Sequence, residues 1–165
     1  AQSVASILEP LGTSCFYRME GWWTYELCFR KHVRQFHQEK EQVVAEFYLG
    51  RWDADATDRH VAAHGEFSQE EGLVGAAPKR YASQVYTNGT GCDLTGGTRQ
   101  TEVRFACAEG SSFVESVKEP ETCKYVLSFS TPLICKHHAF AVKETPVKTI
   151  ACQAYDPAAG GGDGE

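Results

Sequence analysis

Seven cysteines divide this chain, and between them lie polar and aromatic side chains of the types that recognise sugar hydroxyls. Cys15 and Cys28 enclose the tandem Trp22-Trp23. Guanidinium groups donate hydrogen bonds, carboxylates accept them and a phenolic hydroxyl does both, so together they match neighbouring hydroxyls of a sugar. An exposed indole adds a flat apolar surface for the ring. A second group of polar residues comprises Arg99, Glu119 and Tyr125. Four more cysteines surround it: Cys92, Cys107, Cys123 and Cys135.

The number of cysteines, 7, is odd. Six could form three disulfides and leave one over, and the sequence alone allows many connectivities. The competing interpretation of a cysteine-rich chain is a zinc site, which typically uses C-x-x-C pairs together with closely spaced histidines. The chain contains no C-x-x-C pair. We therefore expect a disulfide framework made in an oxidising compartment, with no metal site and no cofactor.

Length and charge limit the class of protein. A chain of 165 residues is long enough for one domain with a single core. The formal net charge of −6, with basic residues scattered along the chain, argues against a nucleic-acid partner. No apolar run approaches the roughly 20 residues that cross a bilayer, so we expect no membrane span. The chain begins at Ala1 without a charged-then-apolar leader, and we expect a processed segment.

Alternation of apolar and polar residues with a period of two dominates the chain, which is typical of half-buried strands. Other segments are marked as strands by aromatic and β-branched residues, and turn residues such as Asn88-Gly89 separate them. Many short strands with turns between them predict an all-β fold, a flattened antiparallel β-barrel or sandwich stapled by three disulfides. The predicted strands are Trp22–Phe29, Gln42–Gly50, Arg80–Tyr86, Thr101–Cys107, Cys123–Phe129 and His138–Val142.

Two stretches depart from this pattern. Residues 53–78 are polar and lack a clean period, so we expect a mobile insertion with a helical turn through Ala54–Ala63. Residues 156–165 are Gly-rich and acidic and cannot bury a core, which predicts a disordered tail. The domain would then span residues 1–155, with its core between residues 15 and 135.

Asn88-Gly89-Thr90 fits the acceptor pattern for N-linked glycosylation, and Asn88 is the only asparagine in the chain. Asn-Gly is also a favoured hairpin turn. Both interpretations can hold together, because a glycan on a surface turn costs the fold little. We expect Asn88 to carry a glycan where the source cell glycosylates.

The tandem tryptophans cannot both be core residues of a sheet that is buried on one side. Adjacent side chains of a strand point to opposite faces, so one indole should pack inward and the other lie near the surface, unless the segment is bulged. Ordinary aromatic packing therefore accounts for one tryptophan and poorly for the second. The outer ring of Trp22-Trp23 is a candidate platform for a sugar ring.

Taken alone, Gln35, Arg99, Glu119 and Tyr125 are ordinary surface residues, and composition does not select them. These residues are selected instead by six blocks of sequence that are interleaved with six cysteines. The blocks are Gly21–Cys28, His32–His37, Tyr86–Leu94, Arg99–Cys107, Glu119–Leu127 and Thr131–Cys135. In this order they resemble the mannose-6-phosphate-receptor-homology (MRH) domain. The resemblance is strongest to the lectins of the OS-nine type that act in endoplasmic-reticulum-associated degradation.

The resemblance implies a binding site and a disulfide pattern. MRH domains bind mannose through a Gln, an Arg, a Glu and a Tyr. In the family, Gln and Arg address the axial 2-hydroxyl, Glu and Tyr address the 3- and 4-hydroxyls, and the tandem Trp contacts a neighbouring mannose. The loop before the third cysteine, Asn88–Gly91, offers no cation for a phosphate, which implies plain mannose as the ligand. The implied residues are Gln35, Arg99, Glu119, Tyr125, Trp22 and Trp23, with disulfides Cys15–Cys28, Cys92–Cys123 and Cys107–Cys135 and with Cys152 outside this framework.

The implied function is that of a lectin domain in the endoplasmic reticulum lumen, not that of an enzyme. It would bind trimmed high-mannose N-glycans with a terminal α1,6-linked mannose on misfolded glycoproteins, which its parent protein would pass to a membrane ubiquitin-ligase complex through an adaptor. One alternative is the MRH domain of a regulatory subunit of a glycan-processing enzyme, against which the tandem Trp argues. Another is a glycoside-processing enzyme, which needs two carboxylates where only Glu119 is available, kept ionised by pairing with Arg99. A third is a protein-interaction module that binds no glycan.

Overall fold

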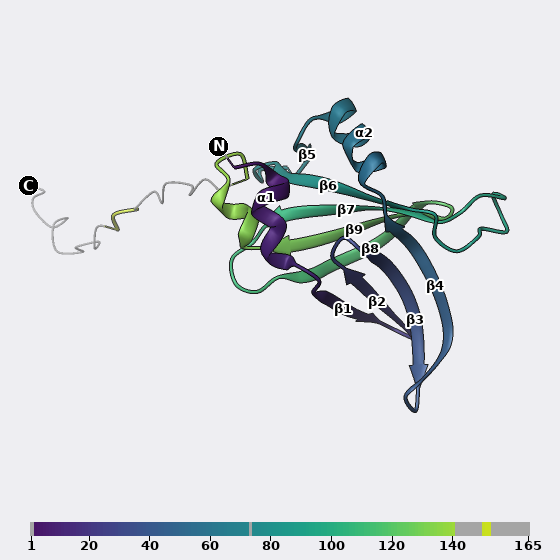
Figure 1. Ribbon diagram of the computed structural model, residues 1–165. Helices are drawn as coiled ribbons and strands as arrows, with labels where there is room; N and C mark the ends of the chain where they lie inside the picture. Colours follow the sequence, from purple (N-terminus) through teal and green to yellow (C-terminus); the bar gives the residue numbers. More distant parts are fainter. Residues whose placement is uncertain (1, 73, 141–149, 153–165) are drawn as a thin grey trace, which may run out of the picture.

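One strongly curved sheet forms the body of the molecule (Figure 1). The computed structural model describes residues 2–72, 74–140 and 150–152. The strands follow the order β1-β2-β3-β4-β6-β7-β9-β8, with β5 paired to β6. Neighbours are antiparallel except β7 and β9, which run parallel. The strands are β1 Cys15–Glu20, β2 Trp23–Cys28, β3 His32–Glu39, β4 Gln42–Trp52, β5 Ser68–Glu70, β6 Lys79–Thr87, β7 Gln100–Cys107, β8 Phe113–Glu121 and β9 Lys124–Thr131.

The sheet is nearly closed, because its two outermost strands, β1 and β8, contact each other. Phe16 of β1 packs edge-on against Phe129 of β9, with ring centroids 4.8 Å apart. Inward-facing residues of the strands, such as Leu27, Val103 and Leu127, are fully buried between them. The predicted all-β, barrel-like fold is therefore confirmed, although the parallel pair β7–β9 departs from a purely antiparallel sheet.

Short helices cover one end of this sheet (Figure 1). They are α1 (Val4–Leu8), η1 (Glu9–Leu11) and η2 (Leu133–Lys136), and they bury Leu8 and Ile134 in the same core as the strands. Ser3 caps α1, since its hydroxyl accepts a hydrogen bond from the Ser6 N–H. Within the described ranges, no helix is both long and apolar enough to cross a membrane.

The segment predicted as an insertion contains regular structure. The helix α2 (Ala54–His64) is capped by Asp53, whose Oδ1 accepts a hydrogen bond from the Ala56 N–H at 2.9 Å. Thr57 fixes the helix to β6, because its Oγ1 accepts the Val85 N–H at 2.9 Å. The predicted helical turn is therefore three turns long, and β5 follows it as a short strand on β6.

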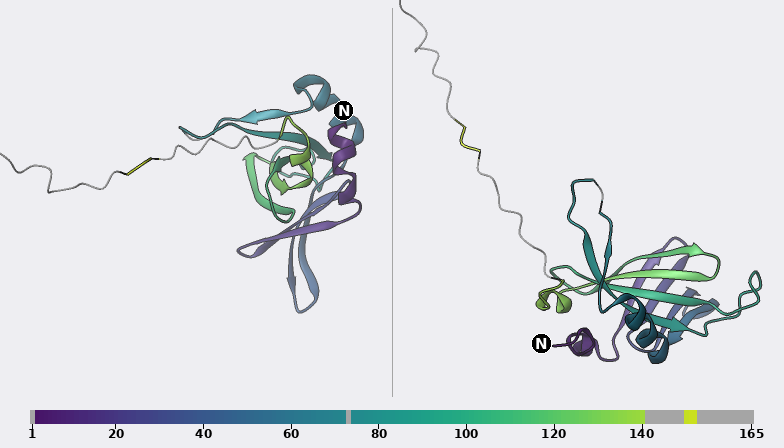
Figure 2. Two further views of the ribbon diagram at one scale, coloured as in Figure 1. Left: turned by 90° about the vertical axis from the view of Figure 1, so that its left-hand side faces the viewer. Right: turned by 90° about the horizontal axis from the view of Figure 1, so that it is seen from above.

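Other segments differ from the predictions at the two ends of the chain. The strand predicted at His138–Val142 is wrong for residues 138–140, which form a turn after η2, and the rest of it lies outside the described residues. The tail predicted at residues 156–165 also lies outside them. The alternation did not single out β1, β3 or β8 as strands. The β3–β4 hairpin is the longest part of the sheet and projects from the rest of it (Figure 2, left).

Three disulfides join the strands, in the pairing that the resemblance implies. Cys15–Cys28 links β1 to β2, and Cys152 is free and exposed. Cys92–Cys123 joins the segments that precede β7 and β9, whereas Cys107–Cys135 joins the segments where those strands end. Two disulfides thus bracket the parallel strand pair.

Gly89 is required by the close approach of three backbone segments. A Cβ at this position would collide with the carbonyl oxygen of Tyr48 and would lie 2.8 Å from that of Arg99. We expect Gly89→Ala to lower the free energy of unfolding by about 1–3 kcal/mol, the usual cost of overpacking. Gly91→Ala is the matched control, since nothing lies within 4 Å of its added Cβ. Chemical denaturation measures both values, and equal losses would contradict this account.

Candidate binding site

Arg99 and Tyr125 come together because β7 and β9 run parallel. The first residues of parallel strands lie at the same end of a sheet, and Thr101 of β7 is opposite Tyr125 of β9. Arg99 directly precedes β7, so its side chain starts from the same end. Glu119, near the end of β8, reaches this place from the neighbouring strand. Three of the four residues predicted to bind the sugar therefore share one end of the sheet.

The Tyr125 hydroxyl lies between two charged groups. Its side chain is buried, with an exposed fraction of 9% for the residue. Burial raises the pKa of Tyr125, the Glu119 carboxylate adds to this increase, and hydrogen bonding with the Arg99 guanidinium opposes it. The phenol therefore stays protonated at neutral pH and can both donate and accept a hydrogen bond.

Arg99 is held in place from two sides. Its guanidinium carbon lies 4.6 Å from the centroid of the Phe47 ring, and Nη1 donates to the carbonyl oxygen of Thr90 at 3.2 Å and to that of Gly91. The same guanidinium faces the Tyr125 hydroxyl. A guanidinium fixed in this way is suited to a hydroxyl ligand, since little rotational freedom is lost on binding.

Gln35 joins the site through a tyrosine that the sequence did not single out. Gln35 of β3 is opposite Tyr25 of β2, and its Nε2 donates to the Tyr25 hydroxyl at 3.3 Å. Burial raises the pKa of Tyr25, and so do the charge of Glu20 and the neighbouring Tyr125 and Glu119. Tyr25 thus connects Gln35 to the side of the site that carries Tyr125.

Of the two supporting residues, Tyr25 could have been found from strand periodicity, whereas Phe47 could not. Tyr25 lies two residues after Trp23, so the two side chains share a face of β2. Phe47 is opposite Gln35 in the β3–β4 pairing and lies beneath Arg99, but this register is not visible in the sequence. Aromatic rings therefore form much of the floor of the site.

Glu119 does not form the predicted ion pair with Arg99. Its Oε1 accepts a hydrogen bond from the Cys123 backbone N–H at 3.1 Å, and no ion pair between Arg99 and Glu119 is present in the described part of the chain. The two charged groups instead flank Tyr125. The Cys92–Cys123 disulfide ties the turn that orients Glu119 to the loop that holds Arg99.

The two tryptophans differ in exposure, but not through strand alternation. Trp22 lies in the turn before β2 and is 50% exposed, whereas Trp23 begins the strand and is half-buried against Phe47. Their rings touch edge to face, with centroids 4.7 Å apart, and the Trp22 ring stacks on His37 at 3.7 Å. Trp22 lies in the turn and is the more exposed of the two, so it is the outer indole.

The predicted glycosylation site lies beside the candidate binding site. Asn88 is exposed and has a φ of 51°, in the left-handed region that asparagine tolerates. The next residues are fully engaged by the fold, since Gly89 donates its N–H to the Arg99 carbonyl and Thr90 Oγ1 accepts the Tyr48 N–H. Modification of Asn88 stays a prediction.

Relatives of known name cover most of the chain. A family model described as Glucosidase II beta subunit-like protein matches residues 13–92. The chain is 46% identical to Protein OS-9 homolog of Arabidopsis thaliana over 149 residues, which are 90% of this chain and 51% of that protein. It is 37% identical to Protein OS-9 of Homo sapiens over 142 residues, which are 81% of this chain and 20% of that protein. The chain thus spans about half of the plant relative and a fifth of the human one.

A solved structure agrees with these relatives. The MRH domain of Yos9, determined in complex with alpha3,alpha6-Man5, matches with a TM-score of 0.61 and 25% sequence identity, over 86% of this chain and 89% of that one. The chain belongs to the MRH family. The resemblance to the OS-9 type is confirmed by the sequence relatives, and the MRH fold by the structural neighbour.

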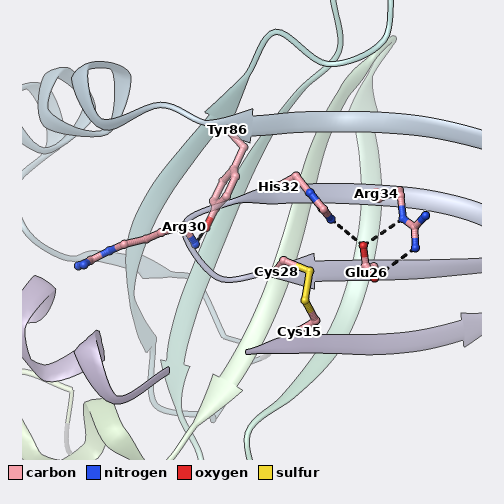
Figure 3. Close-up of a disulfide and its surroundings, with 7 residues drawn as sticks. All are labelled: Cys15, Glu26, Cys28, Arg30, His32, Arg34 and Tyr86. Atoms are coloured by element: carbon pink, nitrogen blue, oxygen red, sulfur yellow. Dashed lines mark hydrogen bonds and ion pairs between the residues drawn. A yellow bond between two sulfur atoms is a disulfide. The ribbon is translucent and has the colours of Figure 1, made fainter. Parts of the chain in front are cut away.

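A buried carboxylate lies on the opposite face of the same strands of the MRH domain (Figure 3). Glu26 is 5% exposed and accepts hydrogen bonds from His32 Nε2 at 2.6 Å and from Arg34 Nε at 3.0 Å. The Cys15–Cys28 sulfurs lie close by, but they are joined to each other and so offer no thiolate for a metal. Since Glu26, His32 and Arg34 span β2 and β3, the cluster fixes the register that places Tyr25 opposite Gln35.

The stability that Glu26 gives the MRH domain should depend on pH. Burial alone would raise the pKa of Glu26, but hydrogen bonds from His32, Tyr17 and Arg34 outweigh it and hold the pKa below its ordinary value. The contribution is therefore present above the ordinary carboxyl range and is lost as the pH falls through the lowered pKa. Glu26→Gln should lower the free energy of unfolding by about 1–3 kcal/mol at pH 7.

Denaturation curves at several pH values measure this effect. The difference between the parent and Glu26→Gln should shrink as the pH falls below the ordinary carboxyl range. Glu121→Gln is the control, because Glu121 is exposed, and its change should stay within about 0.5 kcal/mol. A difference for Glu26→Gln that is constant down to pH 3 would contradict the role of the carboxylate charge.

Proposed function

We propose that this MRH domain binds the terminal mannose of trimmed high-mannose N-glycans. The convergence of Arg99, Glu119 and Tyr125 with Gln35 on one end of the sheet, from four separate segments, is the observation that supports it. Gln35 and Arg99 supply donors for the axial 2-hydroxyl. Glu119 supplies an acceptor and Tyr125 a group of either kind for the 3- and 4-hydroxyls.

The outer indole gives the site a way to contact a second sugar. Trp22 is half exposed and braced by the His37 ring, so it offers a rigid apolar face beside the polar set. We propose that Trp22 and Trp23 contact the mannose next to the terminal one, as in a glycan arm that ends in an α1,6-linked mannose. The Yos9 domain, whose structure was determined with a branched five-mannose glycan, supports a ligand of this class.

The site is proposed to bind sugar without cleaving it. Hydrolysis of a glycosidic bond needs one carboxylic acid and one carboxylate flanking that bond. Of the two carboxylates near the tyrosines, Glu119 is engaged by the Cys123 N–H and Glu20 by Arg18 at 2.7 Å. Both carboxylates therefore already have a partner within the fold.

The cellular role follows from this ligand. Three disulfides require an oxidising compartment, and trimmed high-mannose glycans on misfolded glycoproteins are displayed in the endoplasmic reticulum lumen. We propose that the longer protein of which this domain is part acts there in degradation of such glycoproteins. It would pass them to a membrane ubiquitin-ligase complex through an adaptor, as the resemblance to the OS-nine type implies.

Tyr125→Phe is a sharp test of the sugar site, because it removes one hydroxyl and keeps the buried ring. The lost hydrogen bond should weaken binding of a mannose-terminated glycan by about 3- to 10-fold, and Gln35→Ala should have a similar effect. NMR titration with methyl α-mannoside measures this change. Tyr81→Phe, on β6 beside Arg104, is the matched control and should bind as the parent does. Unchanged binding by Tyr125→Phe, with the fold intact, would place the site elsewhere.

Trp22→Ala should separate the terminal sugar from the rest of the glycan. Loss of an aromatic platform, about 0.5–1.5 kcal/mol, should weaken binding of an α1,6-linked mannose arm by roughly 2- to 10-fold while methyl α-mannoside binds as before. A glycan array with both ligands measures the ratio. Met19→Ala is the control, because Met19 is 80% exposed on the adjoining strand. Equal losses for the two ligands would assign Trp22 a role in the fold alone.

A further inference from the structure

A cavity of about 410 Å³ lies at the other end of the sheet from the candidate sugar site. It is enclosed by α1, α2 and β6, and Phe105 from the far end of β7 forms part of its wall. Arg99 lies at the opposite end of that strand, about 20 Å away at the usual rise of a strand. The cavity is therefore a separate site, and its volume falls in the range of ligand-binding pockets.

A buried amide lies in the wall of this cavity. Gln84 is 6% exposed and lines the cavity together with apolar residues such as Val4, Leu8 and Val61. The Arg30 backbone N–H donates to the Tyr86 hydroxyl at 3.1 Å, and that hydroxyl donates to Gln84 Oε1 at 2.9 Å. This relay fixes the orientation of the amide, and among the described residues its NH₂ group has no partner. The nitrogen of this amide is reached by solvent, so it is free to donate a hydrogen bond to a ligand that enters the cavity.

The edge of β6 is also unpaired at the cavity. Val85 uses both backbone groups on this edge, since its N–H donates to Thr57 Oγ1 and its carbonyl accepts the Asp53 N–H. Pairing with β5 stops at Tyr81. Ser83 lies between them and lines the cavity, and alternate residues of an antiparallel strand face the same edge. Ser83 therefore directs one donor and one acceptor into a gap that no described residue fills.

The rim of the cavity is acidic. Asp58 of α2 and Glu66 line it, and Glu66 uses only Oε1, which accepts the Val4 N–H. Among the described residues that line the cavity, the one cation is Arg30, which is already paired with Glu9 at 2.6 Å. Electrostatics therefore favour a ligand with positive charge next to its apolar part.

We propose that this cavity binds a short extended segment of another polypeptide, with an apolar side chain flanked by basic residues. One residue of the segment donates its N–H to the Ser83 C=O and accepts the Ser83 N–H with its own C=O, in the manner of antiparallel strand addition, and another carbonyl of the segment accepts from Gln84. The apolar side chain fills the space between α1 and α2. Lys or Arg neighbours contact Asp58 and Glu66. The proposal is independent of sugar binding.

A blocked pentapeptide, acetyl-Lys-Val-Leu-Val-Lys-amide, tests this with the 165-residue chain. On titration, NMR signals of the Ser83 backbone amide and the Gln84 side-chain amide should shift, and methyl α-mannoside should not compete. Ala62→Trp should weaken binding at least 10-fold, because Ala62 lines the cavity. Ala63→Trp, the next residue of α2 and outside the cavity, should bind within 2-fold of the parent.

Two changes of charge and backbone complete the test. Replacing both lysines of the peptide by glutamate should weaken binding at least 5-fold. Asp58→Lys should abolish this preference for the lysine peptide over the glutamate peptide. Because Asp58 is exposed, this variant remains a usable test even if Ala62→Trp fails to fold. A peptide N-methylated at leucine should bind at least 10-fold more weakly, because it cannot donate to the Ser83 carbonyl. Equal binding of the methylated peptide, or no shift at Ser83, would overturn the proposal.

Discussion

The structure depends on a close contact between three backbones around Gly89. Thr90 exchanges hydrogen bonds with Tyr48 of β4, through its own N–H and its hydroxyl, while Gly89 and Arg99 bond across the same loop. These contacts fix β4 against the start of β7 where the two strands do not pair. They also set the backbone of Arg99 and bring Phe47, next to Tyr48, beneath its guanidinium. The position of the Arg99 guanidinium thus follows from main-chain hydrogen bonding and from the absence of a Cβ at Gly89.

The two faces of the β2–β3 pair have different tasks. One face carries Tyr25 and Gln35 toward the candidate sugar site, and the other buries Glu26 with Arg34. A slip of one residue in this pairing would exchange the two sets, since side chains alternate between faces. The buried ionic cluster therefore keeps Tyr25 and Gln35 on the binding face by fixing the register, although it does not contact that face.

Much of the fold was predictable from local pattern. Alternation located β4, β7 and β9, because their inward residues form the core, and the content of aromatic and β-branched residues located β2 and β6. It did not reveal β8, where apolar residues are sparse, or the tight turn at Lys40-Glu41, whose positive φ values occur without glycine or asparagine. The parallel pairing of β7 and β9 was also out of reach, because strand order is a property of the whole chain.

The candidate site was predictable only through the family resemblance. Gln35, Arg99 and the Glu119–Tyr125 segment lie far apart in the sequence and have no shared period, so no local rule connects them. The partners that orient them were not predicted, notably Tyr25 for Gln35 and the Cys123 N–H for Glu119. Such contacts depend on register and on turn geometry, which are decided by tertiary structure.

The disulfides around the parallel pair impose an order on the maturation of the chain. Cys15 and Cys28 are 13 residues apart on a hairpin and can be oxidised as soon as β2 has been synthesised. The other two bonds span 31 and 28 residues, and their loops overlap, so both must wait until β9 lies beside β7. During that interval the four cysteines of these two bonds, together with Cys152, are available for mispairing, and reshuffling of such bonds takes seconds to hours. A lectin proposed to inspect misfolded glycoproteins thus shares with them a slow and error-prone oxidative step.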